Sequence, residues 1–208
     1  MKTYGVQRDL IQEEIFDKIG MQETKFWENF ESFDMLQNLA SPSINLDGKP
    51  TNIFVEKENL THYLKCEPIG ITTTCNDLTK WMQYLLKNED QFLKLENFYT
   101  KEEETHLVVD DHGNLDYLKG GEKVTKSTLN DLVEEWTHSG FSMGYTSKAR
   151  IFPQFNFGVF VVSNCLSSPL PELVSSYIIE SLFDLPIEKR KFNLNKVLNE
   201  LKILKSWG

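Results

Sequence analysis

The sequence predicts an α+β fold, in which a helical segment precedes antiparallel strands and C-terminal helices. Residues 74–87 follow the 3.6-residue period of an amphipathic helix. Residues 136–162 contain three strand-like segments with short connections, which favour antiparallel pairing. We therefore expect one domain over residues 1–208. It should be mainly helix and loop to about residue 131, with sheet strands and C-terminal helices from about residue 132.

The composition excludes several classes of partner. The chain has 208 residues, with 22 basic and 31 acidic side chains and a net charge of −9. Nucleic acids and anionic lipids are polyanions, so an acidic chain is a poor partner for either. No apolar run is long enough to span a bilayer, and the N-terminal residues do not resemble a secretory leader. We expect a soluble protein, cytoplasmic by default.

The first half of the chain contains two predicted helices and a loop. Apolar side chains recur at spacings near four over residues 4–19, and Gly20 would end that helix. Residues 40–52 are rich in Ser, Pro and Asp-Gly, which predicts a loop. In the helix over 74–87, Thr74 caps the N-terminus and Asp77 completes a capping-box-like start. Its buried stripe would consist of Leu78, Trp81, Met82, Leu85 and Leu86.

A hairpin and three strands are expected next. Residues 107–109 and 115–117 flank a turn-rich tip, which predicts a hairpin over 105–118 and lacks the spacing of a calcium loop. Strands follow at 136–140 and at 145–151, the latter ended by Pro153. The apolar run 157–162 is typical of a strand covered on both faces.

Two helices are expected at the C-terminus. The first begins near Pro171, and its inward residues would be Leu173, Val174, Tyr177, Ile178 and Leu182. The last would place Leu194, Val197, Leu198, Leu201 and Leu204 on one stripe.

Residue chemistry alone suggests only weak sites. His138 beside Ser139 could indicate acid–base or nucleophilic chemistry. Neighbours on a strand point to opposite faces, however, so these residues cannot easily pair, and a strand end with a turn glycine is the simpler interpretation. Cys75 at a helix start could be a thiolate, but a small half-buried thiol is simpler. Three cysteines without a C-x-x-C pattern predict reduced thiols. The acidic run 102–104 reads as a solvated face.

Three segments in order resemble one family. Residues 15–24 resemble I-F-x-P-L-G-M-x-x-T, residues 70–81 resemble G-I-x-S-T-x-x-D-L-x-K-W, and residues 138–147 resemble H-x-G-x-x-x-G-Y-x-S. Residues 156–158 and 161–164 then match the strand of the same family that follows. These patterns resemble the serine β-lactamase and penicillin-binding-protein superfamily. The resemblance is closest to the branch that holds class C β-lactamases, related esterases, D-aminopeptidases and the mitochondrial β-lactamase-like protein.

The resemblance implies a partial β-lactamase/transpeptidase-like fold and a set of site residues. His138 would occupy the position that lysine usually holds in the third family motif, where it could donate a hydrogen bond or exchange a proton near neutral pH. Ser139, Gly140 and Phe141 would be binding residues, and the Phe141 backbone N–H would be an oxyanion-hole donor. The ligand would be a small-molecule ester or amide, or a peptide. The family's serine chemistry implies no organic cofactor and no metal.

The sequence departs from the family at the nucleophile. No lysine has a serine three residues before it, and no tyrosine has an asparagine two residues after it. The one S-x-N triplet, Ser43 to Asn45, follows the Gly-Met segment, whereas the family motif precedes it. Without the nucleophile, acyl-enzyme chemistry cannot run.

Three hypotheses therefore stay open. The chain could be the C-terminal portion of a β-lactamase-related hydrolase, inactive alone and completed by an N-terminal half. It could be a non-catalytic binding or regulatory relative that keeps the H-x-G wall. It could also be a remnant with an aggregation-prone apolar edge at 157–162.

Overall fold

The computed structural model describes most of the segments that carry these predictions. The described residues are 8–26, 39–46, 49–53, 70–87, 115–118, 121–124, 133–142, 144–166 and 168–186. The chain divides into two compact units, Met1–Ala40 with Phe54–Glu89 and Ser41–Ile53 with Asp90–Gly208. In the described residues, no helix is long and apolar enough to cross a membrane.

The first unit begins with the predicted helix, which is described from Arg8 onward. Gln12–Asp17 forms a π-helical stretch within it. The helix ends at Gly20, whose φ of +80° is a conformation that glycine adopts without strain. The Met21 N–H donates to the Phe16 carbonyl and the Gly20 N–H to the Asp17 carbonyl, which is a Schellman ending. The predicted stop at Gly20 is therefore confirmed.

The second helix of this unit, α4 (Cys75–Lys87), confirms the predicted helix over 74–87. The Thr74 hydroxyl accepts from the Asp77 N–H at 3.3 Å, as an N-cap should. Met82 and Leu85 are buried, and the rest of the predicted stripe is half-buried. Just before α4, strand β4 (Ile71–Thr72) pairs antiparallel with β1 (Lys25–Phe26). Residues 27–38 lie outside the described residues.

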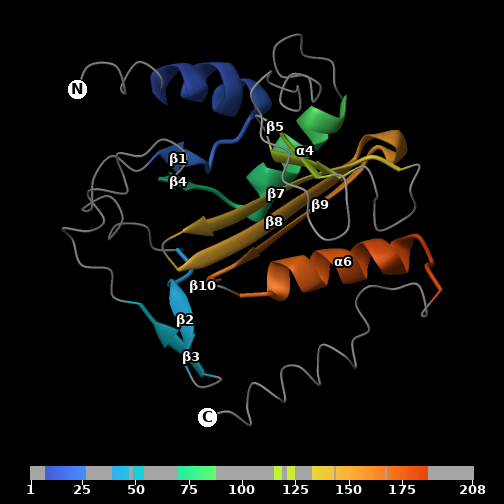
Figure 1. The fold of residues 1–208 in the computed structure, drawn as a ribbon. Helices are drawn as coiled ribbons and strands as arrows, with labels where there is room; N and C mark the ends of the chain where they lie inside the picture. Colours follow the sequence, from blue (N-terminus) through green and yellow to red (C-terminus); the bar gives the residue numbers. More distant parts are fainter. Residues whose placement is uncertain are drawn as a thin grey trace. The chain divides into compact units, whose positions relative to one another are not determined.

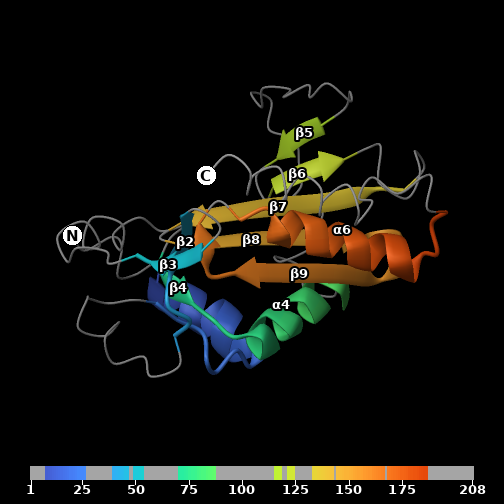
Figure 2. The same ribbon diagram turned by 90° about the horizontal axis from the view of Figure 1, so that it is seen from below.

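The second unit contains a five-stranded antiparallel sheet in the order β5-β6-β7-β8-β9 (Figures 1 and 2). Its strands are β5 (Leu115–Leu118), β6 (Gly121–Val124), β7 (Glu135–Ser142), β8 (Tyr145–Phe152) and β9 (Phe157–Ser163). The last three confirm the strands and the antiparallel pairing predicted from the sequence. A short 3₁₀ turn, Pro153–Phe155, ends β8 as expected.

One expectation about this sheet is untested and another is wrong. The predicted hairpin pairs residues 107–109 with 115–117; β5 forms and pairs with β6, while residues 107–109 lie outside the described part, so the hairpin stays a prediction. The predicted cover on both faces of β9 is wrong. Its residues are half-buried, and Val162, which pairs with Ser147 and lies on the sheet face away from α6, is 49% exposed.

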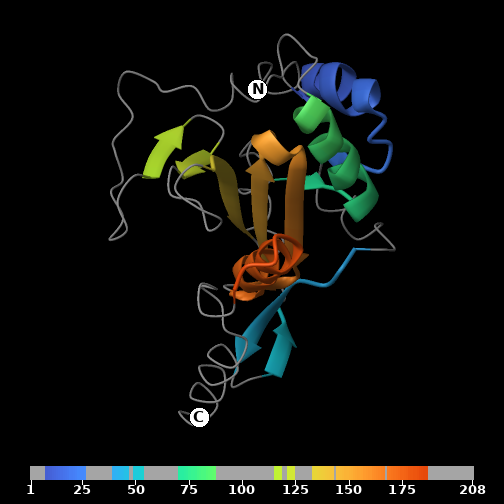
Figure 3. The ribbon, with the colours of Figure 1, turned by 90° about the vertical axis from the view of Figure 1, so that its right-hand side faces the viewer.

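The loop expected over 40–52 is wrong as well. Strands β2 (Ser43–Leu46) and β3 (Lys49–Asn52) pair antiparallel across Asp-Gly, a strong hairpin signal. β2 also pairs parallel with β10 (Cys165–Leu166). Both the N–H and the hydroxyl of Ser43 donate to the Asn164 carbonyl, at 2.8 and 2.7 Å. This small sheet extends past the end of the larger one (Figure 3).

Helix α6 (Leu170–Leu182) packs on β8 and β9, but with a different face inward from the one expected (Figures 1 and 2). The buried residues of α6 are Pro171, Ser175, Ser176, Ile179 and Glu180. Val174, Tyr177 and Leu182, which were expected inward, are 40%, 50% and 64% exposed. Arg150 is buried on the side of the sheet that α6 covers. The face of α6 that packs on the sheet is therefore polar. The final predicted helix lies outside the described residues.

A small apolar core lies between the C-terminal end of α6 and the sheet. Val133, Phe152 and Ile179 are buried there, and Phe157, Val159 and Phe183 pack against them. Phe183 lies at ring-to-ring distances of 6.3 Å from Phe152 and 5.8 Å from Phe157.

Candidate functional site

The residues expected at the site lie in the middle of β7. His138, Ser139 and Gly140 pair in register with Ala149, Lys148 and Ser147 of β8. The interpretation of this motif as a strand end with a turn glycine is therefore wrong, because β7 continues to Ser142. His138 and Ser139 are exposed, and Phe141 is 65% exposed.

Among the described strands, β6 covers only the first part of one edge of β7. The β6–β7 ladder pairs Glu122, Lys123 and Val124 with residues 135–137. Among the described strands, residues 138–142 have a partner on the β8 side only. In any strand, half of the backbone N–H and C=O groups point toward each edge, so no described strand pairs with the groups that this stretch directs away from β8.

The two faces of the sheet differ at this point. His138 and Gly140 share one face with Tyr145 and Ser147, because these residues alternate along paired strands. A side-chain carbon on Gly140 would overlap the Ser147 hydroxyl, so any other residue there would require the Ser147 side chain to rotate. On the opposite face, the Ser139 hydroxyl accepts from Lys148 Nζ at 3.2 Å. Burial raises the pKa of the Tyr145 phenol above its ordinary 10.0, so this hydroxyl is neutral at physiological pH.

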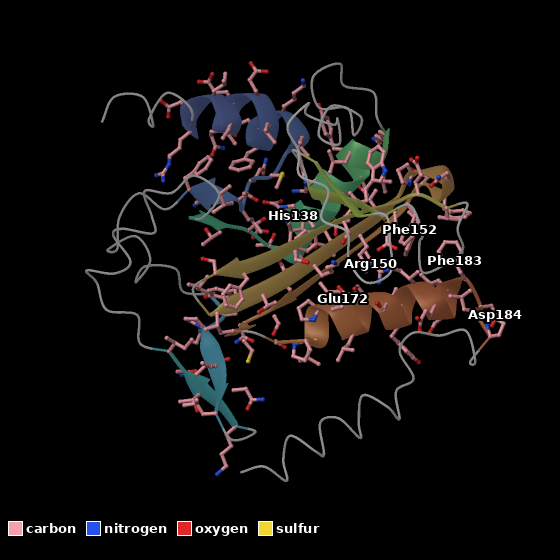
Figure 4. All side chains as sticks on the ribbon, viewed as in Figure 1. His138, Arg150, Phe152, Glu172, Phe183 and Asp184 are labelled. Atoms are coloured by element: carbon pink, nitrogen blue, oxygen red, sulfur yellow. The ribbon has the colours of Figure 1, made fainter. Side chains whose placement is uncertain are left out.

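A buried ion-pair network supports the Ser139 face of the sheet. Arg150 Nε donates to Glu135 Oε1 at 2.5 Å, and both side chains are only 4% exposed. Arg150 Nη1 donates to the Ser176 hydroxyl of α6 at 2.6 Å. Lys148 Nζ lies 3.2 Å from Glu172 Oε2, and Figure 4 shows Glu172 on α6 toward the Arg150 side of the sheet.

This network joins β7, β8 and α6 with two positive and two negative charges, so its formal charges cancel. Sequence reasoning missed it, because Lys148 and Arg150 alternate with less polar residues along 145–151, a pattern that by itself favours a solvent-exposed polar side. The available signal was that Glu135 and Arg150 both occur inside strands of a sheet that a helix must cover. Charged residues in such positions are rarely buried unless they are paired.

In the first unit, Asp77 joins the two segments that carry the first two family-like patterns. Asp77 Oδ2 accepts from the Glu23 N–H at 2.8 Å and from the Thr24 hydroxyl at 2.9 Å, and Oδ1 accepts from Lys80 Nζ at 2.8 Å. Burial alone would raise the Asp77 pKa, but the hydrogen bonds from Lys80, Thr24 and the Glu23 N–H hold it below 3.8.

Further bonds complete this clasp between residues 20–24 and 73–80. Lys80 Nζ donates to the Gly20 carbonyl at 2.6 Å, and the Thr24 and Thr73 hydroxyls lie 2.8 Å apart. The Thr74 hydroxyl donates to Glu23 Oε2 at 3.2 Å. Asp77 therefore lies in the first turn of α4 and also links α4 to residues 20–24. The clasp explains structurally why these residue types occur in the two patterns.

The other residues that the sequence singled out have plain surroundings. Cys75 is an exposed free thiol and Cys165 a half-buried one, while Cys66 and the acidic run 102–104 lie outside the described residues. Ser43 of the S-x-N triplet is buried and bonded to the Asn164 carbonyl. No three His, Cys, Asp or Glu side chains gather as a metal site in the described segments.

Comparison with known proteins gives matches in structure alone. No protein-family model matches the chain, and no curated protein matches it. An octameric penicillin-binding protein homologue from Pyrococcus abyssi superposes over 88% of this chain, with a TM-score of 0.66 and 18% identity. A class C β-lactamase superposes over 84%, with a TM-score of 0.55 and 17% identity. A β-lactamase/D-alanine carboxypeptidase from Yersinia pestis, complexed with citrate, superposes over 86%, with a TM-score of 0.54 and 20% identity.

The matches cover only part of those proteins. The chain spans 39%, 50% and 48% of their respective lengths. The part that matches includes mixed helices and an antiparallel sheet, as the resemblance implied. The chain thus has part of the fold of penicillin-binding proteins and class C β-lactamases.

Proposed function

We propose that this chain provides the H-x-G wall of a β-lactamase-related acyl-transfer site, and that on its own it binds an acyl ligand without cleaving it. The edge of β7 beside His138, which no described strand covers, carries this proposal. An extended ester, amide or peptide could add to this edge through main-chain hydrogen bonds.

Each wall residue has a distinct role in the proposal. His138 lies on the face where Gly140 leaves room for the Ser147 hydroxyl, and its exposed imidazole could bond to the ligand or exchange a proton. The Phe141 N–H would bond to the acyl oxygen. Ser139 would act as a positioning residue, because its hydroxyl is engaged by Lys148 on the opposite face.

The absence of S-x-x-K and Y-x-N from the 208 residues supports binding over cleavage by this chain alone. A catalytic serine activated by a neighbouring base is what forms the covalent intermediate in this class of enzyme. Backbone donors alone leave only a residual rate enhancement.

A second candidate is a hydrolase in which another segment supplies the serine, its lysine and the tyrosine. The specific observation in its favour is that the chain spans half or less of the structures it matches. In both candidates the ligand class is that of the Yersinia pestis relative, whose name includes D-alanine carboxypeptidase, so a peptide ending in D-Ala-D-Ala is a suitable probe.

Two measurements test the proposal. A fluorescein-labelled N-acyl-D-Ala-D-Ala peptide should bind the chain, as measured by anisotropy. His138→Ala should weaken binding about 3- to 10-fold, the worth of one hydrogen bond, whereas His112→Ala should leave it unchanged. Equal loss in both variants, or no binding to the unsubstituted chain, would contradict the proposed wall.

Intact-mass spectrometry after incubation with a fluorophosphonate tests the second part. The 208-residue chain should gain no adduct. An adduct on a specific serine would overturn the claim that the chain binds without cleaving. Protein isolated from its native source distinguishes the two candidates, because an adduct on that form only would favour the hydrolase completed by another segment.

A further inference from the structure

The two faces of the β7 wall present different groups beside residue 140. On one face, the Ser139 hydroxyl already accepts a hydrogen bond from Lys148 Nζ at 3.2 Å. On the other face, Gly140 has no side chain, and the Ser147 hydroxyl of β8 fills that space. Ser147 therefore presents its hydroxyl where residue 140 would otherwise place a side chain.

The Ser147 hydroxyl is available to a ligand. Ser147 is half-buried, and within the segments that the structure describes, no group forms a hydrogen bond with its Oγ. A hydroxyl offers one donor and two acceptor sites. A ligand that covers this hydroxyl without bonding to it removes the bonds made by water, whereas a ligand that bonds to it replaces one of them. The hydroxyl can therefore distinguish polar ligands from apolar ones.

The strand register determines which part of a ligand meets Ser147. In the proposed function, an extended ligand pairs with the edge of β7 over residues 138–142. One ligand residue then lies opposite Gly140, and residues opposite each other in an antiparallel pair have Cβ atoms about 4.5–5.5 Å apart. Because the Ser147 hydroxyl stands at the side-chain position of Gly140, a ligand side chain on that face lies within hydrogen-bonding reach of it.

We propose that Ser147 is a specificity-determining residue of the β7 wall. It selects ligands whose residue opposite Gly140 carries a short side chain with a hydrogen-bonding group, such as a hydroxyl. An apolar side chain of the same size covers the Ser147 hydroxyl without bonding to it and is disfavoured. This inference rests on the proposed function, since it concerns a ligand bound at the same edge, and it narrows the ligand class to acylated peptides with a small polar residue.

Fluorescence anisotropy with two matched probes tests this selection. One probe is fluorescein-labelled N-acyl-D-Ser-D-Ser, and the other is its isostere, in which a methyl group replaces each hydroxyl. Each probe carries the same side chain at both positions, so the comparison does not depend on which residue lies opposite Gly140. The unsubstituted chain should bind the serine probe more tightly than the isostere.

The variants assign this preference to one hydroxyl. Ser147→Ala should weaken binding of the serine probe about 3- to 10-fold, the worth of one hydrogen bond, and should not weaken binding of the isostere. Ser181→Ala, which removes the hydroxyl of an exposed serine on α6, should change the binding of neither probe.

Ser147→Cys under reducing conditions separates hydrogen bonding from shape. A thiol resembles a hydroxyl in shape but is a much weaker donor, so this variant should lose the preference as Ser147→Ala does. A preference that survives in Ser147→Cys would overturn the proposal, because shape and not hydrogen bonding would then select the ligand.

The results separate this inference from the proposed function. If both probes bind and His138→Ala weakens both, but Ser147→Ala changes both equally or neither, the inference is wrong while the β7 wall stands. If neither probe binds the unsubstituted chain, the proposed function is contradicted and the inference falls with it.

Discussion

Replacing Asp77 with alanine should destabilise the first unit by about 1–3 kcal/mol. The change removes the acceptor for the Glu23 N–H, the Thr24 hydroxyl and Lys80 Nζ. An unsatisfied buried donor costs about 1–3 kcal/mol. Thr24 is 2% exposed and cannot recover its bond from water, but its hydroxyl lies 2.8 Å from the Thr73 hydroxyl and can donate there instead. The Lys80 side chain is 42% exposed and can be solvated. The Glu23 N–H is the donor that loses its partner, which gives about 1–3 kcal/mol.

Urea unfolding followed by tryptophan fluorescence measures this cost, in a chain that keeps Trp81 on α4 and carries phenylalanine in place of its other three tryptophans. Thr79→Ala on the same helix is the control. It removes only a local bond from an exposed hydroxyl to the Cys75 carbonyl and should cost under about 0.5 kcal/mol. A cost below about 1 kcal/mol for Asp77→Ala would refute the clasp as a stabilising element.

The pH dependence gives a second check on Asp77. Its folded-state pKa lies below 3.8, so its ionised form is favoured by folding. This contribution is fully present above the ordinary pKa and is lost as the pH falls through the lowered folded-state value. The difference in unfolding free energy between the unsubstituted chain and Asp77→Asn should thus be constant near neutral pH and shrink below pH 3.8. A constant gap through this acid range would contradict the assignment.

The second unit offers three further predictions. Arg150→Ala should lower the free energy of unfolding in urea by about 3–5 kcal/mol, because it leaves the buried Glu135 carboxylate without its positive partner. Arg150→Met combined with Glu135→Leu should recover most of that loss. Gly140→Ala should lower the melting temperature by overlap with Ser147, and adding Ser147→Ala should restore it; an unrestored double variant would refute the overlap. In an ultraviolet titration of the folded chain, Tyr145→Phe should remove a phenol that ionises above pH 10.0, and an unchanged curve above that pH would contradict the burial of this hydroxyl.

The local elements could be predicted wherever one short stretch of sequence determines them. The helix over 74–87 combines an apolar period with a capping threonine, and both signals lie within a few residues. The strands 135–163 combine alternation, an apolar run and Pro153. The β2–β3 pair was missed, because Asp-Gly was read as part of a loop although it is also the commonest hairpin link.

Three features depend on contacts between residues far apart in the sequence, and local patterns could not predict them. The inward face of α6 depends on Arg150, which lies on a different element, so an apolar stripe was wrongly assigned inward. The stretch of the β7 edge that no described strand covers depends on where the β6 ladder stops, and no local pattern encodes that point. Asp77 bonds to Glu23, 54 residues away, which no spacing rule reveals. His138 was found through a family resemblance, since residue chemistry alone favoured a turn.

The backbone amides of β7 test the central claim most directly. Two-dimensional ¹⁵N–¹H spectra of the chain, titrated with N-acyl-D-Ala-D-Ala peptide, follow the Gly140 and Phe141 amides individually. If the β7 edge beside His138 is the binding wall, both amides should shift saturably, and the amides of α6 should not. Saturable shifts confined to other elements, or none at any peptide concentration, would contradict the account.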